Sequence, residues 1–211
     1  MSYKIETLFN RYPELKSTEE SIMSAFNIIR NSFTGASTLY TCGNGGSAAD
    51  AEHMVGELMK GFLLPRKTAP ELYSKLKEQY GDEGTELADG LQEGLRAISL
   101  NGHPSLATAY GNDVNFEMIF AQQLYVLGKP GDTLMGFTTS GNSANIVKAF
   151  KVAKALGVKT IAMTGKNGGE CRAIVDCCIT VPETETYKVQ ELHLPVYHAL
   201  CAMLENEFYG E

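Results

Sequence analysis

The chain has 211 residues and a formal net charge of −7, and 44% of its residues are hydrophobic and 20% are charged. The length fits a single domain, and the composition is that of a packed globular protein, which excludes a disordered chain. The negative charge disfavours non-specific binding to nucleic acid or to anionic membranes, because such binding needs a basic surface.

The beginning of the chain is charged, and no stretch approaches the roughly 20 apolar residues of a membrane span. We therefore expect no signal peptide and no membrane partner. The five cysteines are odd in number and show no paired spacing, which is typical of reduced thiols. Together these features predict a cytoplasmic protein.

The first predicted element is a helix over about 17–33. Ser17 as N-cap and Glu20 three residues later fit a capping box. Apolar residues then recur at helical spacing, at Ile22, Ala25, Phe26 and Ile29. This stripe predicts burial against a sheet or against another subunit.

Short apolar runs follow, and runs of this length suit the central strands of a parallel sheet. They lie at 38–42, 106–110, 133–137, 159–163 and 177–181. Helical patterns separate several of them, most clearly at 144–156, where Gly157 is expected just after the last helical residue. The last helix is predicted over about 186–208. This order predicts a doubly wound α/β fold in one domain spanning 1–211.

The segment 63–95 differs from the rest of the chain. It carries four basic and seven acidic side chains, hence a net charge of −3, and several glycines. We expect it to be a solvated excursion outside the core, in which 69–79 forms a short helix.

Two loops connect a predicted strand to a predicted helix, where ligands bind in open α/β sheets. In the first, 42–50, the glycines allow backbone N–H groups to approach a ligand, and the following helix start favours anions. It lacks the Lys of a phosphate-binding P-loop and does not complete a dinucleotide fingerprint. A tight turn explains this loop as well as ligand binding does.

The second loop gathers four hydroxyl side chains at a helix start, which are those of Thr138, Thr139, Ser140 and Ser143. Neutral donors together with the helix dipole can hold a phosphate without Lys or Arg. An ordinary N-cap is the alternative, but it requires one such side chain rather than four. The loop therefore predicts a phosphate site.

Candidate acid–base residues lie on two helices. His53 and Glu57 are four apart, which places them on one helix face, where they could transfer protons, bind a metal or form an ordinary surface pair. Gln190 and His198 are eight apart, roughly 12 Å along the last helix. His193 competes with His198 for a role.

In combination, these motifs resemble the phosphoheptose isomerase family of SIS (sugar isomerase) domain proteins, which convert sedoheptulose 7-phosphate to D-glycero-D-manno-heptose 7-phosphate. The resemblance rests on 43–53 with Glu57, on Gly111-Asn112-Asp113, on 138–143, and on Gln190-Glu191 with His198. It covers nearly the whole chain outside 63–95.

The resemblance implies a five-stranded parallel sheet flanked by helices, and a homotetramer with sites at subunit interfaces. It implies that Glu57 is the base and His198 its acid–base partner in an isomerisation through an enediol. Substrate contacts are implied for Asn44, Gly45, Gly46, Ser47, Asn112, Asp113 and Gln190, and phosphate contacts for Thr138, Thr139, Ser140 and Ser143. Some members carry zinc on residues that correspond to His53, Glu57, Gln190 and His198.

The segment 63–95 is longer than the usual link of the family by roughly 20–25 residues. This difference leaves open an isomerase of another phosphosugar. A third reading is a non-catalytic sugar-phosphate-binding regulator, because one fold can serve several functions. The presence of Glu57, Gln190 and His198 together favours an enzyme.

Overall fold

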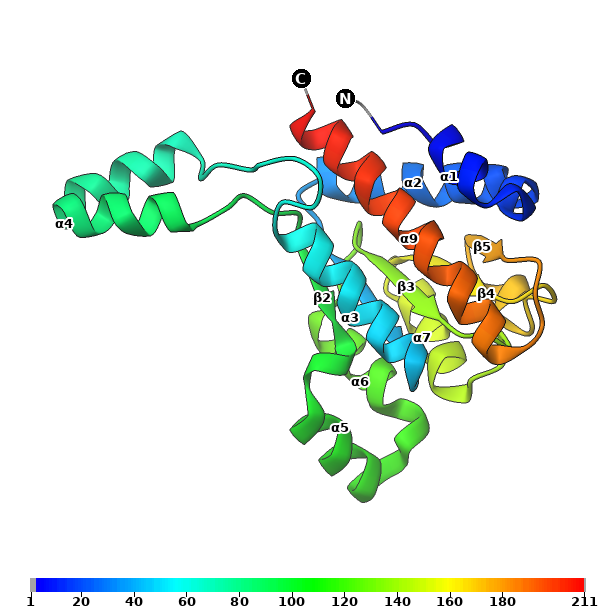
Figure 1. Ribbon diagram of the computed structural model, residues 1–211. Helices are drawn as coiled ribbons and strands as arrows, with labels where there is room; N and C mark the ends of the chain where they lie inside the picture. Colours follow the sequence, from blue (N-terminus) through cyan, green and yellow to red (C-terminus); the bar gives the residue numbers. More distant parts are fainter. Residues whose placement is uncertain (1–2, 211) are drawn as a thin grey trace.

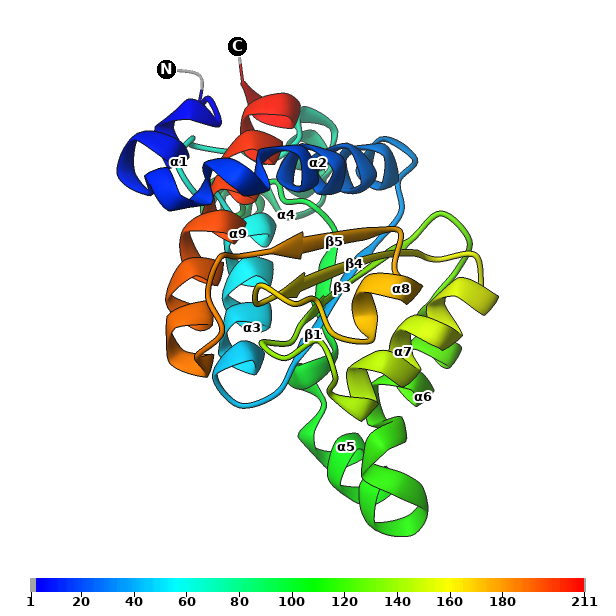
Figure 2. The same ribbon diagram turned by 90° about the vertical axis from the view of Figure 1, so that its right-hand side faces the viewer.

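The computed structural model describes residues 3–210. At its centre lies a parallel sheet of five strands in the order β2-β1-β3-β4-β5 (Figures 1 and 2). The strands are β1 (Leu39–Gly43), β2 (Ala97–Ser99), β3 (Thr133–Phe137), β4 (Lys159–Thr164) and β5 (Cys177–Thr180). The doubly wound α/β fold with a five-stranded parallel sheet is thus confirmed.

Helices cover both faces of the sheet (Figure 2). Successive strand residues alternate between two cores, because side chains point to opposite faces of a strand. In β3, Met135 packs with α1, α2, α3 and α9, whereas Leu134 packs with α6, α7 and α8. These helices are α1 (Glu6–Arg11), α2 (Glu19–Thr34), α3 (Gly46–Met59), α6 (Ile119–Leu127), α7 (Ala144–Ala155), α8 (Cys171–Ile174) and α9 (Thr186–Tyr209).

The register of the sheet determines where its loops meet. Gly43 pairs with Phe137, and Phe137 pairs with Met163. Strands β1, β3 and β4 therefore end at the same level, and the loops that follow them lie side by side. This is the edge at which open α/β sheets bind ligands.

One predicted strand is wrong. Residues 106–110 belong to α5 (Pro104–Tyr110), which has no fully buried residue. Pro104 lies in the first turn of this helix, where its missing N–H is not needed. The strand at that place in the sheet is the three-residue β2, which lies upstream of the apolar run and is too short to be recognised by its composition.

The predicted start of the N-terminal helix also needs correction. Ser17 lies in a 3-10 turn, η1 (Pro13–Thr18), and α2 begins after Thr18 without a side-chain cap. The Thr18 hydroxyl donates instead to the carbonyl of Leu15 at 2.6 Å. The capping box is therefore absent. The helices at 144–155 and 186–209 agree with prediction, and Gly157 has the positive φ of +74° expected after a helix end.

The charged segment forms a helical hairpin that projects from the body of the molecule (Figure 1). Element α4 (Pro70–Gly90) contains a sharp turn at Gly81, where φ is +61° and ψ is −127°. The predicted exposure is confirmed, but the helical part is longer than the predicted 69–79. A second projection carries α5 and the short turns η2 (Leu100–Gly102), η3 (Gly111–Asn115) and η4 (Phe116–Met118).

Within residues 3–210, none of the helices combines the length and the apolar character needed to cross a membrane.

Candidate active site

The first predicted ligand loop is bonded to the helix that follows the second. Asn44 in the first loop and Asn145 in the first turn of α7 exchange two amide hydrogen bonds, of 2.9 and 2.8 Å. This reciprocal pair joins the loop after β1 to the helix that follows the loop after β3. Sequence analysis missed Asn145, because an Asn inside a helical pattern carries no signal that it faces another loop.

The first loop depends on its glycines. A Cβ at Gly43 would lie 2.1 Å from the carbonyl oxygen of Ser47, so only glycine fits there. Gly45 has a φ of +56°, a conformation that glycine adopts without strain. The chain can therefore turn directly from β1 into α3, and the start of α3 lies at the sheet edge.

The hydroxyl loop is held in one conformation by its own bonds. The hydroxyls of Thr138 and Ser143 lie 3.0 Å apart and share a hydrogen bond. The backbone N–H of Asn142 donates to Ser140 Oγ at 3.1 Å. Thr138 is buried, whereas Ser140 is exposed. The four hydroxyls predicted to hold phosphate thus lie in one ordered turn at the start of α7.

A chain of polar side chains connects α3 and α9. Tyr197 Oη lies 2.9 Å from His53 Nδ1, and His53 Nε2 lies 3.1 Å from Glu57 Oε1. Lys60 Nζ donates to Glu57 Oε2 at 2.7 Å, and Tyr197 also donates to Asp50 at 3.5 Å. The predicted pair on one helix face is confirmed. Asp50 and Tyr197 were not predicted, because their role depends on the packing of α9 against α3. Lys60 was also missed, although it lies only three residues after Glu57.

These neighbours shift the pKa values of the carboxyl groups. Partial burial alone would raise the pKa of Glu57, but the Lys60 ammonium and the His53 ring outweigh it and hold the pKa below its ordinary value. Burial raises the pKa of Asp50 to about 6, against the opposing effects of Tyr197 and His53. Glu57 is therefore an ionised carboxylate at neutral pH, as a base must be.

His198 packs against this row of hydrogen-bonded side chains. Its ring centroid is 4.9 Å from that of His53 and 5.5 Å from that of Phe62. Burial and the charge of His53 lower the pKa of His198, so the neutral ring prevails at neutral pH. Its Nε2 is buried and has no hydrogen-bond partner among the described residues. An unpaired ring nitrogen of this kind is available to a ligand.

The alternative histidine of α9 is not part of this site. His193 is fully buried, and its ring faces Phe137 in the core. Burial lowers its pKa to about 4, which keeps the ring neutral. Of the two histidines that the sequence left open, the structure thus brings only His198 to the acid–base group.

Gln190 lies nearer to the glycine loop than to the histidines. Its Nε2 is 3.5 Å from Ser47 Oγ, and its amide fills the space that a Cβ at Gly46 would need. Gln190 and His198 therefore occupy different parts of the same helix face. Ser47 itself is buried in the first turn of α3.

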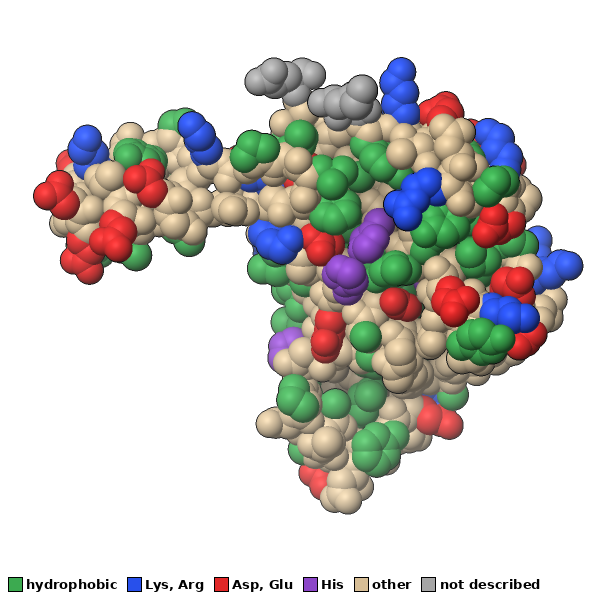
Figure 3. All heavy atoms as spheres, viewed as in Figure 1, with side chains coloured by type: hydrophobic (Ala, Val, Ile, Leu, Met, Phe, Trp, Pro, Cys, Tyr) green, Lys and Arg blue, Asp and Glu red, His purple; other side chains and the backbone are tan. Residues whose placement is uncertain are grey.

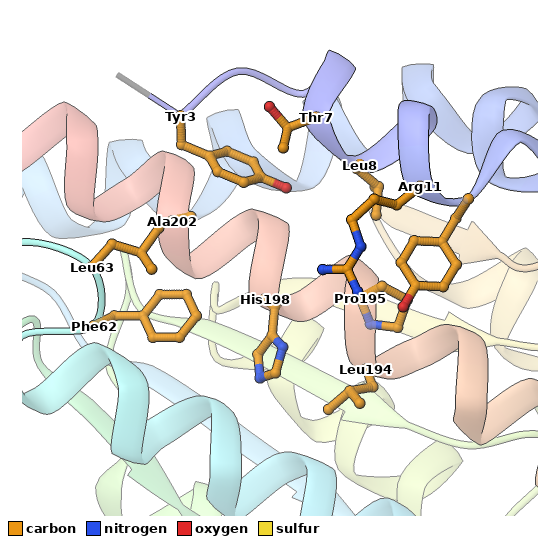
Figure 4. A pocket seen from close by; sticks show the side chains of 11 residues that line it. Tyr3, Thr7, Leu8, Arg11, Phe62, Leu63, Leu194, Pro195, His198 and Ala202 are labelled. Atoms are coloured by element: carbon orange, nitrogen blue, oxygen red, sulfur yellow. The ribbon is translucent and has the colours of Figure 1, made fainter. Parts of the chain in front are cut away.

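A pocket of about 300 Å³ opens beside His198, between the N-terminal segment and α9 (Figure 4). Arg11, Phe62 and Leu63 line it together with Leu194. Because it lies beside the acid–base residues and not over the hydroxyl loop, it does not by itself define a sugar-phosphate site. On the surface, histidine and acidic side chains lie close together over α3 and α9 (Figure 3).

Asn112 and Asp113 lie apart from the other predicted site residues. They belong to η3 on the projection below the sheet, and both are exposed (Figure 1). The Asn112 amide donates to Asp113 at 3.0 Å. Within residues 3–210 no hydrogen bond connects either side chain to α3, α9 or the hydroxyl loop. The described hydrogen bonds therefore do not join these two side chains to the rest of the predicted site.

The side chains predicted to bind zinc are also not arranged as a complete metal site. His53, Glu57 and His198 are neighbours, but no three His, Cys, Asp or Glu side chains of the described part are arranged to hold a metal ion. Two imidazoles and a carboxylate are nevertheless ligands that zinc prefers. The donor chemistry fits zinc, and the side-chain positions would have to change to bind it.

A parallel sheet with a hydroxyl loop and a glycine loop at one edge is the arrangement of a sugar isomerase domain. A profile described as "SIS domain" matches residues 5–98 and 91–165. The phosphoheptose isomerase of Akkermansia muciniphila is 35% identical over 201 residues, which cover 95% of this chain and 93% of the relative. That of Geotalea daltonii is 38% identical over 190 residues, covering 90% and 85%.

Solved structures agree with this assignment. The structure of a phosphoheptose isomerase from Francisella tularensis superimposes with a TM-score of 0.74 at 28% identity, covering 96% of each chain. The chain therefore belongs to the phosphoheptose isomerase family of SIS-domain proteins.

Proposed function

We propose that the protein isomerises sedoheptulose 7-phosphate to D-glycero-D-manno-heptose 7-phosphate. The observation that carries this proposal is the environment of Glu57, a carboxylate held ionised by Lys60 and His53 beside the neutral ring of His198. An aldose–ketose isomerisation needs such a base next to a group that donates and accepts protons.

In this mechanism the Glu57 carboxylate removes a proton from C1 of the ketose, and an enediol forms. The same carboxylate returns the proton to C2. His198, as a neutral imidazole, moves a proton from the C1 oxygen to the C2 oxygen, so the number of protons on the sugar is unchanged. Lys60 and His53 keep Glu57 ionised at the start of each cycle.

The residues of the two loops bind the substrate. Thr138, Thr139, Ser140 and Ser143 hold the phosphate, while Asn44, Gly45, Gly46, Ser47 and Gln190 bind the sugar. Binding energy from the phosphate end orients the reacting end. The hydroxyls and helix starts are neutral or weakly positive, so the overall charge of −7 does not repel the phosphate.

Zinc is part of the proposal. His53, Glu57, Gln190 and His198 would hold it, supported by the chemistry of the donors and by the unpaired Nε2 of His198. When bound, zinc would polarise the carbonyl of the sugar. Metal analysis of the purified protein tests this proposal, and unchanged activity after complete chelation would exclude an essential zinc.

We also propose a homotetramer with sites at subunit interfaces, in the cytoplasm. Asn112 and Asp113 lie away from Glu57 in the same copy, so they would serve the site of a neighbour. The projection that bears them exposes large apolar side chains, among them Val114 at 62% and Phe116 at 59%. Contiguous apolar surface of this kind is typical of protein interfaces.

The direct test is to incubate the protein with sedoheptulose 7-phosphate and to follow the aldoheptose 7-phosphate. Glu57→Gln should lower kcat by about 10²–10⁴, whereas Glu52→Gln, exposed on the same helix, should retain full activity. Absence of turnover with this ketose and with a panel of other ketose phosphates would exclude an isomerase.

An isomerase of another phosphosugar is the second candidate, and the hairpin α4 favours it. This hairpin is inserted directly after the helix that carries His53 and Glu57. The panel of ketose phosphates separates the two candidates by the substrate with the highest kcat/KM. A non-catalytic regulator would bind phosphosugars without turnover.

A further inference from the structure

A buried carboxylate on α9 holds the chain that leaves α3. Glu205 lies near the end of α9 and is 1% exposed. Its Oε1 accepts the backbone N–H of Phe62 at 2.7 Å, and its Oε2 accepts those of Leu63 and Leu64 at 2.7 and 3.0 Å. These three N–H groups belong to the turn 60–64, which follows α3 directly. The turn is therefore fixed to α9 and not only to the helix that it leaves.

Arg66, whose side chain is also fully buried, completes this arrangement. Its Nε donates to Glu205 Oε1 at 3.0 Å, and its Nη1 donates to the carbonyl of Leu58 at 2.7 Å. With the Arg66 bond, each oxygen of the Glu205 carboxylate accepts two hydrogen bonds, so its lone pairs are all used. The carbonyl of Leu58, in the last turn of α3, is one of those without a partner inside the helix. This buried ion pair thus joins the end of α3, the turn 60–64 and α9.

The turn 60–64 bears two side chains that contact the acid–base residues. Lys60 Nζ donates to Glu57 Oε2 at 2.7 Å, and the Phe62 ring centroid lies 5.5 Å from that of His198. Lys60 has left the helix, with an extended φ of −138° and ψ of 174°, so the helical repeat of α3 does not determine its position. The bonds between the turn and α9 determine it instead. Loss of those bonds would displace both contacts at once.

The cost of burying these two charges indicates that they serve more than stability. Removing two charges from water carries a desolvation penalty, and apolar residues of similar volume often give equal or greater stability. An apolar pair, however, could not accept three backbone N–H groups or donate to a helix carbonyl. The ion pair therefore fixes the direction in which the chain leaves α3, a function that hydrophobic packing does not provide.

We propose that Arg66 and Glu205 are positioning residues of the active site, which hold the turn 60–64 so that its side chains stay against the acid–base residues. Both act through Lys60 and Phe62 and do not need to contact the substrate. This role rests on the proposed function, because it assigns the buried ion pair to the same isomerisation. The ion pair therefore contributes to catalysis through the geometry of the turn.

A fluorophore in the turn measures its geometry independently of activity. The chain contains no tryptophan, and Phe62 lines the pocket of about 300 Å³ beside His198, so Phe62→Trp introduces a single probe there. Adding Glu205→Gln to this variant should shift the emission maximum to the red and lower the fluorescence anisotropy, because an amide has only one acceptor oxygen and the turn is released. Adding Leu124→Ala, fully buried in the other core, should leave both unchanged.

Kinetics of variants that retain Phe62 separates positioning from a purely structural role. Glu205→Gln should lower kcat by about 10–100-fold, as expected for a residue that orients active-site groups, while KM changes little. Leu124→Ala, which also lowers the melting temperature, should retain kcat at temperatures where both variants are folded. Arg66→Lys keeps the positive charge but loses the fork that reaches both partners. It should show a smaller loss of kcat, and it provides the same test if Glu205→Gln does not fold.

Equal kcat in Glu205→Gln, Arg66→Lys and Leu124→Ala would reduce the ion pair to a stabilising contact and overturn the proposal. An unshifted emission maximum would do the same, because the turn would then keep its position without Glu205. If the wild-type protein turns over none of the ketose phosphates, the proposed function fails, and the emission of the Phe62→Trp variants still decides whether the ion pair holds the turn.

Discussion

The hydroxyl of Tyr197 lies 2.9 Å from Nδ1 of His53, and this contact orients the imidazole toward Glu57. Tyr197 is fully buried, and its ring packs against those of both His53 and His198. With Nδ1 engaged, the Nε2 of His53 faces Glu57 Oε1 at 3.1 Å. Outer partners of this kind determine the orientation of a histidine and influence the group that it contacts.

Tyr197→Phe should therefore lower kcat while KM changes little. The ring packing remains, but His53 loses the partner that orients it, and a decrease of about 10–100-fold is expected for such a partner. Steady-state kinetics measures the effect, and the loss of one hydrogen bond should reduce the free energy of unfolding by only about 1 kcal/mol. Tyr187→Phe, exposed on the same helix, is the matched control. Equal kcat in both variants would remove Tyr197 from the mechanism.

The buried His193 should make stability fall on the acid side of neutrality. Its folded-state pKa of about 4 lies below its ordinary value of 6.5, because burial disfavours the charged ring. Between these values the unfolded chain binds a proton that the folded protein does not. The stability is therefore complete above pH 6.5 and declines as the pH falls toward 4, by about 3 kcal/mol in total.

Denaturant unfolding at several pH values measures this decline. His193→Leu should remove it, so the difference in stability between wild type and variant should change with pH. His103→Leu, which leaves His193 in place, should retain the wild-type slope. Identical slopes for all three proteins would contradict the assignment to His193.

The sequence predicted best those features that depend on a single strand or helix. The central strands β3 and β4 are continuous apolar runs, and the His53–Glu57 pair follows from the helical repeat. The capping box failed because Thr18 bonds within a preceding 3-10 turn. The predicted strand at 106–110 was wrong, because an apolar run that closely follows a proline, here Pro104, can also form an exposed helix.

Contacts between distant elements had no local signature. The amide pair of Asn44 and Asn145 joins positions 101 residues apart, and the Tyr197–His53 contact joins positions 144 apart. Each depends on how helices pack against the sheet, which the periodicity of a single segment does not encode. The types of residue in the site could thus be predicted, but their orienting partners could not.

Gly43, the first glycine of the glycine loop, should not tolerate a side chain. Gly43→Ala places a Cβ 2.1 Å from the Ser47 carbonyl oxygen, so the turn into α3 must shift. We expect a loss of about 1–3 kcal/mol in stability, together with a raised KM for the phosphosugar. Gly56→Ala, where the added Cβ meets nothing within 4 Å, should stabilise α3 by about 0.5–1 kcal/mol and leave KM unchanged. If Gly43→Ala has wild-type stability and KM, the loop is not held as described.

Ser140 offers the most direct test of the phosphate site, because it is the exposed hydroxyl of the loop and its Oγ accepts the N–H of Asn142 at 3.1 Å. Ser140→Ala removes a donor to the phosphate, and the loss of a hydrogen bond to a charged group costs about 1.5–3 kcal/mol, a factor of roughly 10–150 in binding. KM for the phosphosugar and the inhibition constant of inorganic phosphate should both rise. Ser140→Thr retains the hydroxyl and should restore most of the affinity. If phosphate binds Ser140→Ala as tightly as it binds the wild type, the phosphate lies elsewhere and the roles of the four hydroxyls must be reassigned.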